Sequence, residues 1–274
     1  MNYRHSYHAG NTADVFKHYV LTLVLEALHR KEAPFCLVDS HAGAGIYSLR
    51  RGGEHEHGIG RLWPERERWP ALASYFEIVA RFNPGKKLKQ YPGSPMFMRE
   101  FLRPVDRAVL LELHPQECSF LHEAMRGAPQ VGVHHVSAWN GIRAFVPPKE
   151  NRGLLLIDPP YEQMNEPAAV VAALRHGMHH WRNGIYLVWY PIKSRRTVDS
   201  FYRAVTAAGA PAHAVEFITL PLDMELRLNG SGLLVINPPW HLLDTLGATL
   251  PPLAARLAGE DGSPQVRILD LAAR

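Results

Sequence analysis

The segment GLLLIDPPYE, residues 153–162, decides the expected fold of this 274-residue chain. Its run of apolar residues predicts a strand that is buried on both faces, as in a parallel sheet. Because Pro159 and Pro160 cannot donate ladder hydrogen bonds, the strand ends there and the following loop is stiff. Open α/β sheets bind ligands at the carboxyl ends of their strands, which is where Asp158 and Tyr161 stand.

A carboxylate held at the end of such a strand suits chemistry on the exocyclic amino group of a base. The N6 lone pair of adenine is delocalised into the ring and is a poor nucleophile. Asp158 and the carbonyl of Pro159 both accept hydrogen bonds, so together they can turn the amino group toward an electrophile. Tyr161 offers a face to a base that has left its stack. The alternative is a strand that ends in an acidic turn without a catalytic role.

Composition limits the class of protein. The chain has 30 Lys and Arg against 26 Asp and Glu, and this small positive excess is compatible with a polyanionic partner. Its length favours a single domain over residues 1–274 with a helical subdomain inserted at 50–92. The only cysteines, Cys36 and Cys118, are too few for a disulfide framework or a cysteine-based zinc site, and we expect no metal.

The sequence also argues against a membrane protein. It contains no apolar run of about 18 residues, and its start, MNYRHSYHAGN, lacks the apolar region of a signal peptide. We therefore expect a cytoplasmic protein. No sequence feature requires an oligomer.

A glycine-rich loop follows the first predicted strand. Apolar residues at helical spacing predict a helix over 12–30, capped by Asn11 or Thr12. The first strand covers 35–39, and SHAGAG follows at 40–45. Glycine at this place lets the backbone approach a ligand closely, and the start of a following helix favours anionic groups. Since the loop lacks the full G-x-G-x-x-G pattern, its position after a buried strand carries the argument.

The next strands also end in polar residues. A strand over 108–112 ends at Glu112, which can accept hydrogen bonds from both hydroxyls of a ribose. A strand over 131–136 leads to Asn140, and the opening segment supplies the fourth strand. The remaining predicted elements are a helix over 167–181, a strand over 184–190, a helix over 194–208, and strands over 213–220 and 232–236 that can pair antiparallel.

A second motif, NPPW at 237–240, also follows an apolar strand. A class I methyltransferase sheet presents a glycine loop, a ribose-binding acid, an adenine contact and an amino-group motif after its first four strands. Gly43 and Gly45, Glu112, Asn140 and Asp158 fall in that order. The NPPW motif follows the last strand, so we interpret it as structural.

Two other segments are candidates for contacts with a substrate. Residues 1–11 are aromatic and basic, and we expect them to cover the site rather than form a free tail. Residues 50–90 carry one helical period between Leu72 and Phe82 and many basic side chains, which are either RNA contacts or a solvated face. Between this stretch and the next helix, Ser94 in the turn YPGSP is a plausible N-cap.

Seven segments in the same order resemble the RlmJ-type 23S ribosomal RNA adenine-N6 methyltransferases. They span residues 3 to 240 and read YRHSYHAGNTADVFKH, VDSHAGAG, YPGSP, LLELHP, GLLLIDPPYE, YLVWYP and SGLLVINPPW. The resemblance implies a Rossmann-like methyltransferase domain with a small helical insertion. It also implies S-adenosyl-L-methionine as the methyl donor and one adenine of 23S ribosomal RNA as the acceptor.

The resemblance also implies roles for individual residues. The cofactor pocket comprises His18, His41, Gly43, Ser94, Glu112, Asn140, Gly141 and Asp158. The catalytic residues are Asp158, Pro159 and Tyr161, and the residues near the acceptor are Tyr3, His5 and Lys17. One departure occurs after the third strand, where the family has Ala-Asp-Gly and this chain has Trp139-Asn140-Gly141 after Ala138.

Three other functions are compatible with parts of the sequence. An N6-adenine DNA methyltransferase would share the DPPY chemistry, but the insertion at 50–92 is small for a target-recognition region. A protein glutamine methyltransferase would favour Asn at the first motif position, where this chain has Asp158. A non-catalytic RNA-binding protein would not need an intact DPPY motif together with Glu112 and the glycine loop.

Overall fold

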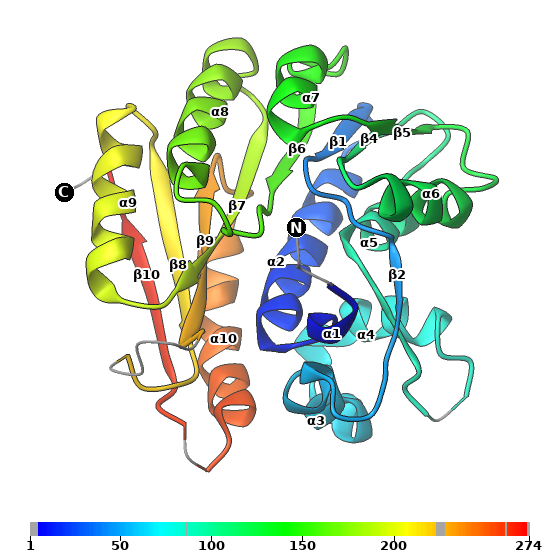
Figure 1. Ribbon diagram of the computed structural model, residues 1–274, viewed down its shortest axis with the longest axis vertical. Coiled ribbons are helices and arrows are strands. Elements are labelled where there is room, and N and C mark those ends of the chain that lie inside the picture. Colours follow the sequence, from blue (N-terminus) through cyan, green and yellow to red (C-terminus); the bar gives the residue numbers. More distant parts are fainter. Residues whose placement is uncertain (1–4, 86, 223–227, 261, 273–274) are drawn as a thin grey trace.

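A β-sheet with parallel and antiparallel strand pairs forms the centre of the molecule (Figure 1). The computed structural model describes residues 5–85, 87–222, 228–260 and 262–272. Within them, the main sheet has the order β10-β8-β9-β7-β6-β1-β4-β5. Its strands are β1 (Phe35–Asp39), β4 (Arg107–Glu112), β5 (Val131–His135), β6 (Arg152–Ile157), β7 (Ile185–Ile192), β8 (Ala212–Ile218), β9 (Gly230–Ile236) and β10 (Gln265–Asp270).

The sheet has a parallel part and an antiparallel part. Strands β5, β4, β1, β6 and β7 run parallel to one another, whereas β9 is antiparallel to both β7 and β8. Strand β10 pairs antiparallel with β8 at the edge. The predicted Rossmann-like α/β fold is therefore confirmed, and so is the antiparallel pairing of the two last predicted strands.

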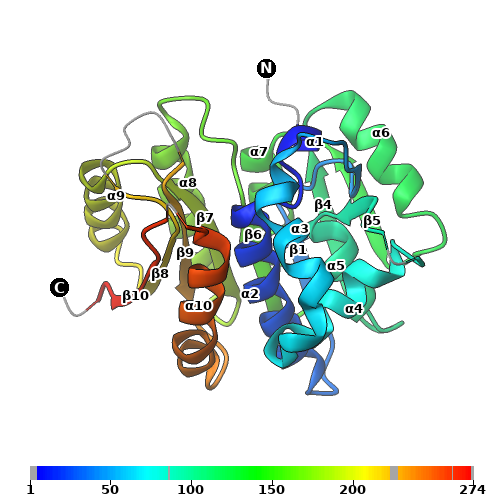
Figure 2. The ribbon, with the colours of Figure 1, turned by 90° about the horizontal axis from the view of Figure 1, so that it is seen from below.

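A helical insertion separates the two strands of a small second sheet, β2 (Ile46–Ser48) and β3 (Gln90–Pro92). It consists of η1 (Glu54–His57), α3 (Ile59–Leu62), η2 (Trp63–Arg68), η3 (Pro70–Leu72) and α4 (Ala73–Arg81). The N-terminal helix α1 (His5–His8) contacts η1, and Figure 2 shows it next to the insertion. The helical insertion in the fold is confirmed, and its delimitation as a subdomain at 50–92 stays a prediction.

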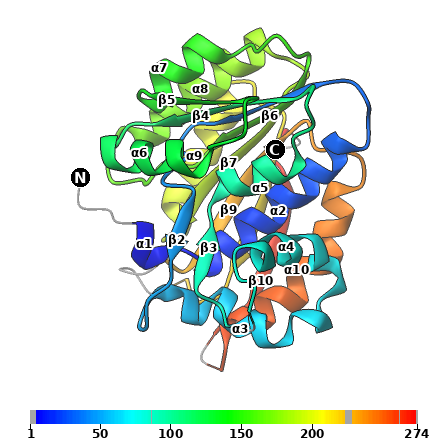
Figure 3. The same cartoon turned by 90° about the vertical axis from the view of Figure 1, so that its right-hand side faces the viewer.

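Helices cover both faces of the sheet (Figure 3). The remaining helices are α2 (Thr12–His29), α5 (Ser94–Phe101), α6 (Pro115–Ala124), α7 (Ala138–Phe145), α8 (Glu166–His180), α9 (Arg195–Ala207) and α10 (Leu242–Ala258). Alternate residues of β6 enter two separate cores: Leu154 and Leu156 pack on the side of α2 and α10, Leu155 and Ile157 on the side of α8 and α9. Each buried side chain of this size contributes about 1.5–3 kcal/mol of hydrophobic free energy, which explains the continuous apolar run.

The order of strands fixes where a ligand can bind. Strand β1 lies between β6 and β4, so the chain reverses its direction of progress across the sheet at this point. The loop after β1 is held between the neighbouring strands, because the Ser40 N–H donates to the carbonyl of Leu156 and the Ala42 N–H to that of Leu111. The carboxyl ends of β1, β4 and β6 therefore meet at one edge, the usual ligand site of such sheets.

One local prediction is wrong. Helix α5 begins at Ser94 itself, with Gly93 as its N-cap, and the Ser94 hydroxyl donates to the carboxylate of Asp39 instead of capping the helix.

No helix within the described ranges is long and apolar enough to cross a membrane.

Candidate active site

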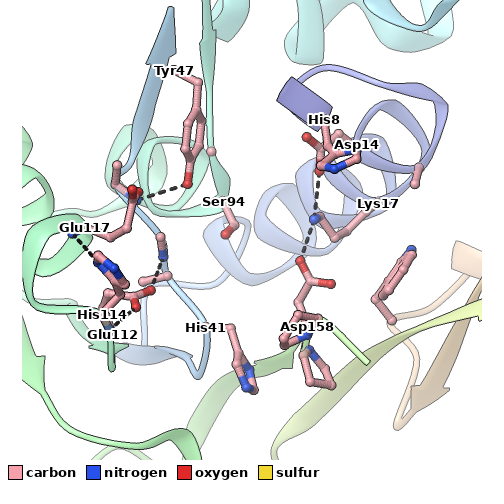
Figure 4. A pocket seen from close by; sticks show the side chains of 18 of the residues that line it. His8, Asp14, Lys17, His41, Tyr47, Ser94, Glu112, His114, Glu117 and Asp158 are labelled. Carbon is pink, nitrogen blue, oxygen red and sulfur yellow. Dashed lines mark hydrogen bonds and ion pairs between the residues drawn. The ribbon is translucent and has the colours of Figure 1, made fainter. Parts of the chain in front are cut away.

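A cavity of about 1730 Å³ opens at the carboxyl ends of β1, β4 and β6. Its wall also includes residues from α1, α2, the start of α5 and the end of β7. Figure 4 shows side chains from these elements pointing toward a common space. The predicted site residues that line it are Lys17, His18, His41, Gly43, Ser94, Glu112, Asp158, Pro159 and Tyr161. The structure thus brings together residues that are as much as 144 positions apart in the chain, from 17 to 161.

A chain of buried charges joins helix α2 to the end of β6. Lys17 Nζ donates to Asp14 Oδ1 at 2.8 Å and to Asp158 Oδ2 at 2.5 Å. Burial alone would lower the pKa of Lys17, but the carboxylates of Asp14 and Asp158 outweigh it and hold the pKa above its ordinary value. Within the described residues, Asp158 Oδ1 takes part in no hydrogen bond, so one oxygen at the cavity wall can accept from a ligand.

Tyr161 is fixed in an unusual backbone conformation. Its φ of 52° lies in the left-handed region, which costs a residue with a Cβ roughly 1–2 kcal/mol. The hydroxyl donates to the carbonyl of Trp189 at 2.9 Å, and the two rings are tilted at 59° with centroids 5.8 Å apart. Burial raises the pKa of Tyr161 above its ordinary value, so its phenol remains a donor. The ring is therefore held rigidly beside the end of β6.

The carboxylate of Glu112 accepts hydrogen bonds from two backbone N–H groups, one of them in the glycine loop. The Gly43 N–H donates to Glu112 Oε2 at 2.8 Å, and the His114 N–H donates to Oε1 at 2.6 Å. Each carboxylate oxygen keeps a further lone pair for another donor. Gly43 has a φ of 64°, and a Cβ added there would lie 2.0 Å from the hydroxyl of Tyr47. This position accordingly requires glycine.

A buried carboxyl lies under the floor of the cavity. Asp39 at the end of β1 is 0% exposed, and it accepts from the Ser94 hydroxyl at 2.7 Å and from the His41 N–H at 3.2 Å. Burial raises the pKa of Asp39 to about 7, although both hydrogen bonds oppose the shift. Asp39 thereby fixes two predicted cofactor residues without reaching the cavity wall itself.

The two histidines of the site are embedded in the protein. Burial lowers the pKa of His41 to about 4, so its ring is neutral at neutral pH, with Nδ1 2.8 Å from Ser40 Oγ. His18 on α2 is 1% exposed and stacks on Phe97, with ring centroids 4.9 Å apart. Its Nδ1 lies 2.9 Å from the hydroxyl of Tyr91. Both rings are positioned by packing more than by charge.

Four predicted site residues are not among those that line the cavity: two lie elsewhere, and two are outside what the structure describes. Asn140 is exposed on α7, and Gly141 packs against Leu111; neither lines the cavity. Tyr3 lies outside the described residues, as does the side chain of His5, whose backbone begins α1. The roles proposed for these four residues stay predictions.

The cavity wall also contains residues that sequence reasoning missed. They are Asp14, Leu113, Ser137, Trp139, Trp189 and Lys193, whereas Tyr7 and His8, which also line the cavity, belong to the segment 1–11 that was expected to cover it. Ser137 carried a readable signal, since its hydroxyl caps α7 by accepting from the Asn140 N–H, as an N-cap serine does. Recognising the cap would have placed the start of α7 at Ala138 and directed attention to Trp139. Within the described ranges, no group of three or more His, Cys, Asp or Glu could hold a metal ion.

Comparison with known proteins gives a consistent result. Residues 32–269 match the protein family described as ribosomal RNA large subunit methyltransferase D, RlmJ. The chain is 38% identical to ribosomal RNA large subunit methyltransferase J of Escherichia coli strain K12 over 263 residues, 94% of each chain. It is 38% identical to the protein of the same name from Haemophilus influenzae strain Rd over 267 residues, 95% of each chain. A crystal structure of a Legionella pneumophila protein superposes with a TM-score of 0.89 at 34% identity, covering 95% of this chain and 98% of the other.

Proposed function

Because this chain belongs to the RlmJ family of ribosomal RNA large subunit methyltransferases, we propose that it methylates N6 of one adenine in 23S ribosomal RNA. S-adenosyl-L-methionine is the proposed donor, and the target base leaves its stack to enter the cavity. The observation that carries this proposal is the carboxylate of Asp158. One of its oxygens is held by Lys17, and the other has no hydrogen bond within the described residues.

The proposed acceptor site is built around the end of β6. Asp158 Oδ1 and the carbonyl of Pro159 accept the two N6 hydrogens, which draws the nitrogen lone pair out of conjugation with the ring. Tyr161 supports the face of the base, since a fixed aromatic ring stacks on any base. Lys17 keeps the Asp158 carboxylate from rotating away. As the new N–CH3 bond forms, N6 loses a proton, and Asp158 is the nearest acceptor to hold it until it passes to water.

The other half of the cavity fits the proposed cofactor. When bound, this cofactor supplies a methyl group activated by a positively charged sulfur. The spare lone pairs of Glu112 suit the two ribose hydroxyls, and Gly43 leaves room where a side chain would collide with Tyr47. Leu113 and Trp139 are apolar wall residues next to Glu112 and at the start of α7, suited to the two faces of an adenine ring. His41, Ser94 and His18 complete this wall.

The N-terminal segment is the proposed cover of the acceptor. Tyr7 and His8 line the cavity, and they follow Tyr3 and His5 within five positions in the chain. Flat side chains at these positions suit contacts with an extruded base or its neighbours, and they exclude water from the reacting atoms.

Transfer of a labelled methyl group tests the function against its alternatives. Purified protein is incubated with labelled S-adenosyl-L-methionine and, in parallel, with 23S ribosomal RNA, duplex DNA or a total protein extract. We expect label in the RNA alone, released by nuclease digestion as N6-methyladenosine. Label in DNA would support the N6-adenine DNA methyltransferase, and label in a protein glutamine would support a protein glutamine methyltransferase. RNA binding without label in any substrate would leave only a non-catalytic role.

A further inference from the structure

The helical insertion contacts residues 8–11 through the side chain of Glu54. Glu54, the first residue of η1, accepts from Asn11 Nδ2 at 2.9 Å with Oε2, and the same oxygen lies 2.9 Å from His8 Nδ1. The hydrogen bond that His8 donates to Glu54 raises the pKa of His8 above its ordinary value, while burial opposes that shift. A carboxylate that binds two donors from one segment fixes both the position and the direction of that segment.

Backbone contacts also join the insertion to residues 8–11. The Ile59 N–H donates to the carbonyl of Gly10 at 2.9 Å, and a Cβ added to Gly58 would lie 2.1 Å from that same oxygen. The insertion and the N-terminal segment therefore approach each other backbone to backbone. Glu54 is the residue of the insertion whose side chain both lines the cavity and hydrogen-bonds to this segment.

Further hydrogen bonds connect Asn11 to Asp158 through Asp14 and Lys17. Asn11 Oδ1 accepts from the Asp14 N–H at 2.9 Å and so caps α2. Asp14 Oδ2 accepts from the Gly10 N–H at 3.0 Å, and its Oδ1 accepts from Lys17, which also binds Asp158. A displacement of Gly10 or Asn11 would therefore change the groups that hold the Asp158 carboxylate.

We propose that Glu54 is a positioning residue for methyl transfer, which seats residues 8–11 against the cavity and through Asp14 and Lys17 orients Asp158. The proposal rests on the function proposed above. It gives the insertion a definite role: to fix the acceptor side of the site from a distance. Among the described residues, Glu54 forms no hydrogen bond or ion pair with Asp158 or Lys17, so its effect on the reaction is indirect.

Kinetics of Glu54→Ala and Glu54→Gln test this inference. We expect Glu54→Ala to lower kcat for RNA methylation about tenfold, the scale of one charge-assisted hydrogen bond. The Kd of the cofactor should change less than about threefold, since the Glu112 side of the cavity is not altered. Glu54→Gln keeps a side-chain oxygen for Asn11, so it should recover much of the lost rate.

Two further variants complete the design. Glu56→Gln is the matched control, because Glu56 also lies in η1 but is exposed and accepts only from the Gly52 N–H within the insertion. It should behave like the parent protein. His8→Ala combined with Glu54→Ala forms a double-mutant cycle, and we expect the two losses to be less than additive since both remove the same contact.

The outcomes separate the inference from the proposed function. If the parent protein methylates RNA and Glu54→Ala does so at the parent rate, Glu54 has no positioning role. Equal losses in cofactor affinity and in kcat would also overturn it, because they would show a general disturbance of the cavity. If Glu54→Ala does not fold, Glu54→Gln and His8→Ala decide the question by the same measurements. Absence of methylation by the parent protein would instead refute the proposed function.

Discussion

The DPPY motif at 158–161 and the NPPW motif at 237–240 both follow an apolar strand but have opposite positions in the fold. Strand β6 is parallel to β1, so Asp158 emerges at the cavity. Strand β9 is antiparallel to β7, so Asn237 emerges at the other edge of the sheet, where its amide donates to the carbonyls of Arg182 and Gly184 at 2.8 Å. The direction of the preceding strand, and not the motif itself, determines which one faces a ligand.

The backbone bends at different positions in the two motifs. In the DPPY motif the left-handed residue is Tyr161, with a φ of 52°, whose ring turns back to Trp189. In the NPPW motif it is Asn237, with a φ of 53°, a residue type that adopts this conformation more readily than most. The first bend therefore places the ring of Tyr161 at the cavity. The second places the amide of Asn237 where it hydrogen-bonds to the loop before β7.

The largest expected effect is that of Asp158→Ala. Removal of a positioned electrostatic contact in a transition state typically costs on the order of 100-fold or more in rate, so methylation should fall at least that far. The fold should persist, because Lys17 keeps Asp14 as its partner. Single-turnover rates and thermal unfolding measure the two effects. A folded variant with near-parent turnover would exclude Asp158 from the mechanism.

Tyr161 should show a smaller effect that depends on its ring. Loss of a stacking surface costs about 1–3 kcal/mol per base, so Tyr161→Ala should lower kcat/KM for RNA by roughly tenfold or more. Tyr161→Phe keeps the ring and loses only the hydrogen bond to the Trp189 carbonyl, so its rate should fall a few-fold at most. Equal losses in both variants would show that the hydroxyl, and not the ring, is what the reaction needs.

Asn237→Ala should affect stability and spare catalysis. It removes two hydrogen bonds, at about 1 kcal/mol each, and leaves alanine in a left-handed conformation, so we expect a loss of about 2–3 kcal/mol in the free energy of unfolding. Asn237→Gly loses the same hydrogen bonds without the backbone strain, and denaturant titration should place it between the two. An inactive but folded Asn237→Ala protein would mean that the second motif is the catalytic one.

The smallest expected effect concerns the aromatic residue of the second motif. Trp240 is 84% exposed, in contrast to the partly buried and hydrogen-bonded Tyr161. Substitutions at such positions usually change stability by less than about 0.5 kcal/mol, so Trp240→Ala should match the parent protein in both unfolding and methylation. A marked loss of RNA methylation alone would reveal a substrate contact at this edge of the sheet.

The parts of the site at strand ends could be predicted from the sequence. Gly43, Glu112 and Asp158 each follow an apolar run, and parallel strands bring their carboxyl ends to one edge. The order of the motifs along the chain also favoured a structural role for the NPPW motif, which follows the last predicted strand. At these residues the local apolar pattern and the topology of the sheet predict the same position, at the cavity.

Residues placed by helix phase or by distant contacts could not be predicted in the same way. Successive helical residues point about 100° apart, so a shift of one position at the start of α7 exchanges Asn140 for Trp139 at the cavity. Asp14 looks in the sequence like an ordinary acid in a first helical turn, although it is buried with Lys17. The contact between Asn11 and Glu54 joins segments 43 positions apart and has no local signature.

The sequence separation of the contacts in the site has a consequence for folding. Asn11 meets Glu54 across 43 positions, Ser94 meets Asp39 across 55 and Gly43 meets Glu112 across 69, whereas Lys17 meets Asp158 across 141. Closing a longer loop costs more chain entropy, and long-range pairings slow folding. During synthesis, every partner in the first three contacts has left the ribosome before Asp158 is added. A nascent chain would therefore complete the glycine loop and its acid first, and it would acquire the residue that handles the base only afterwards.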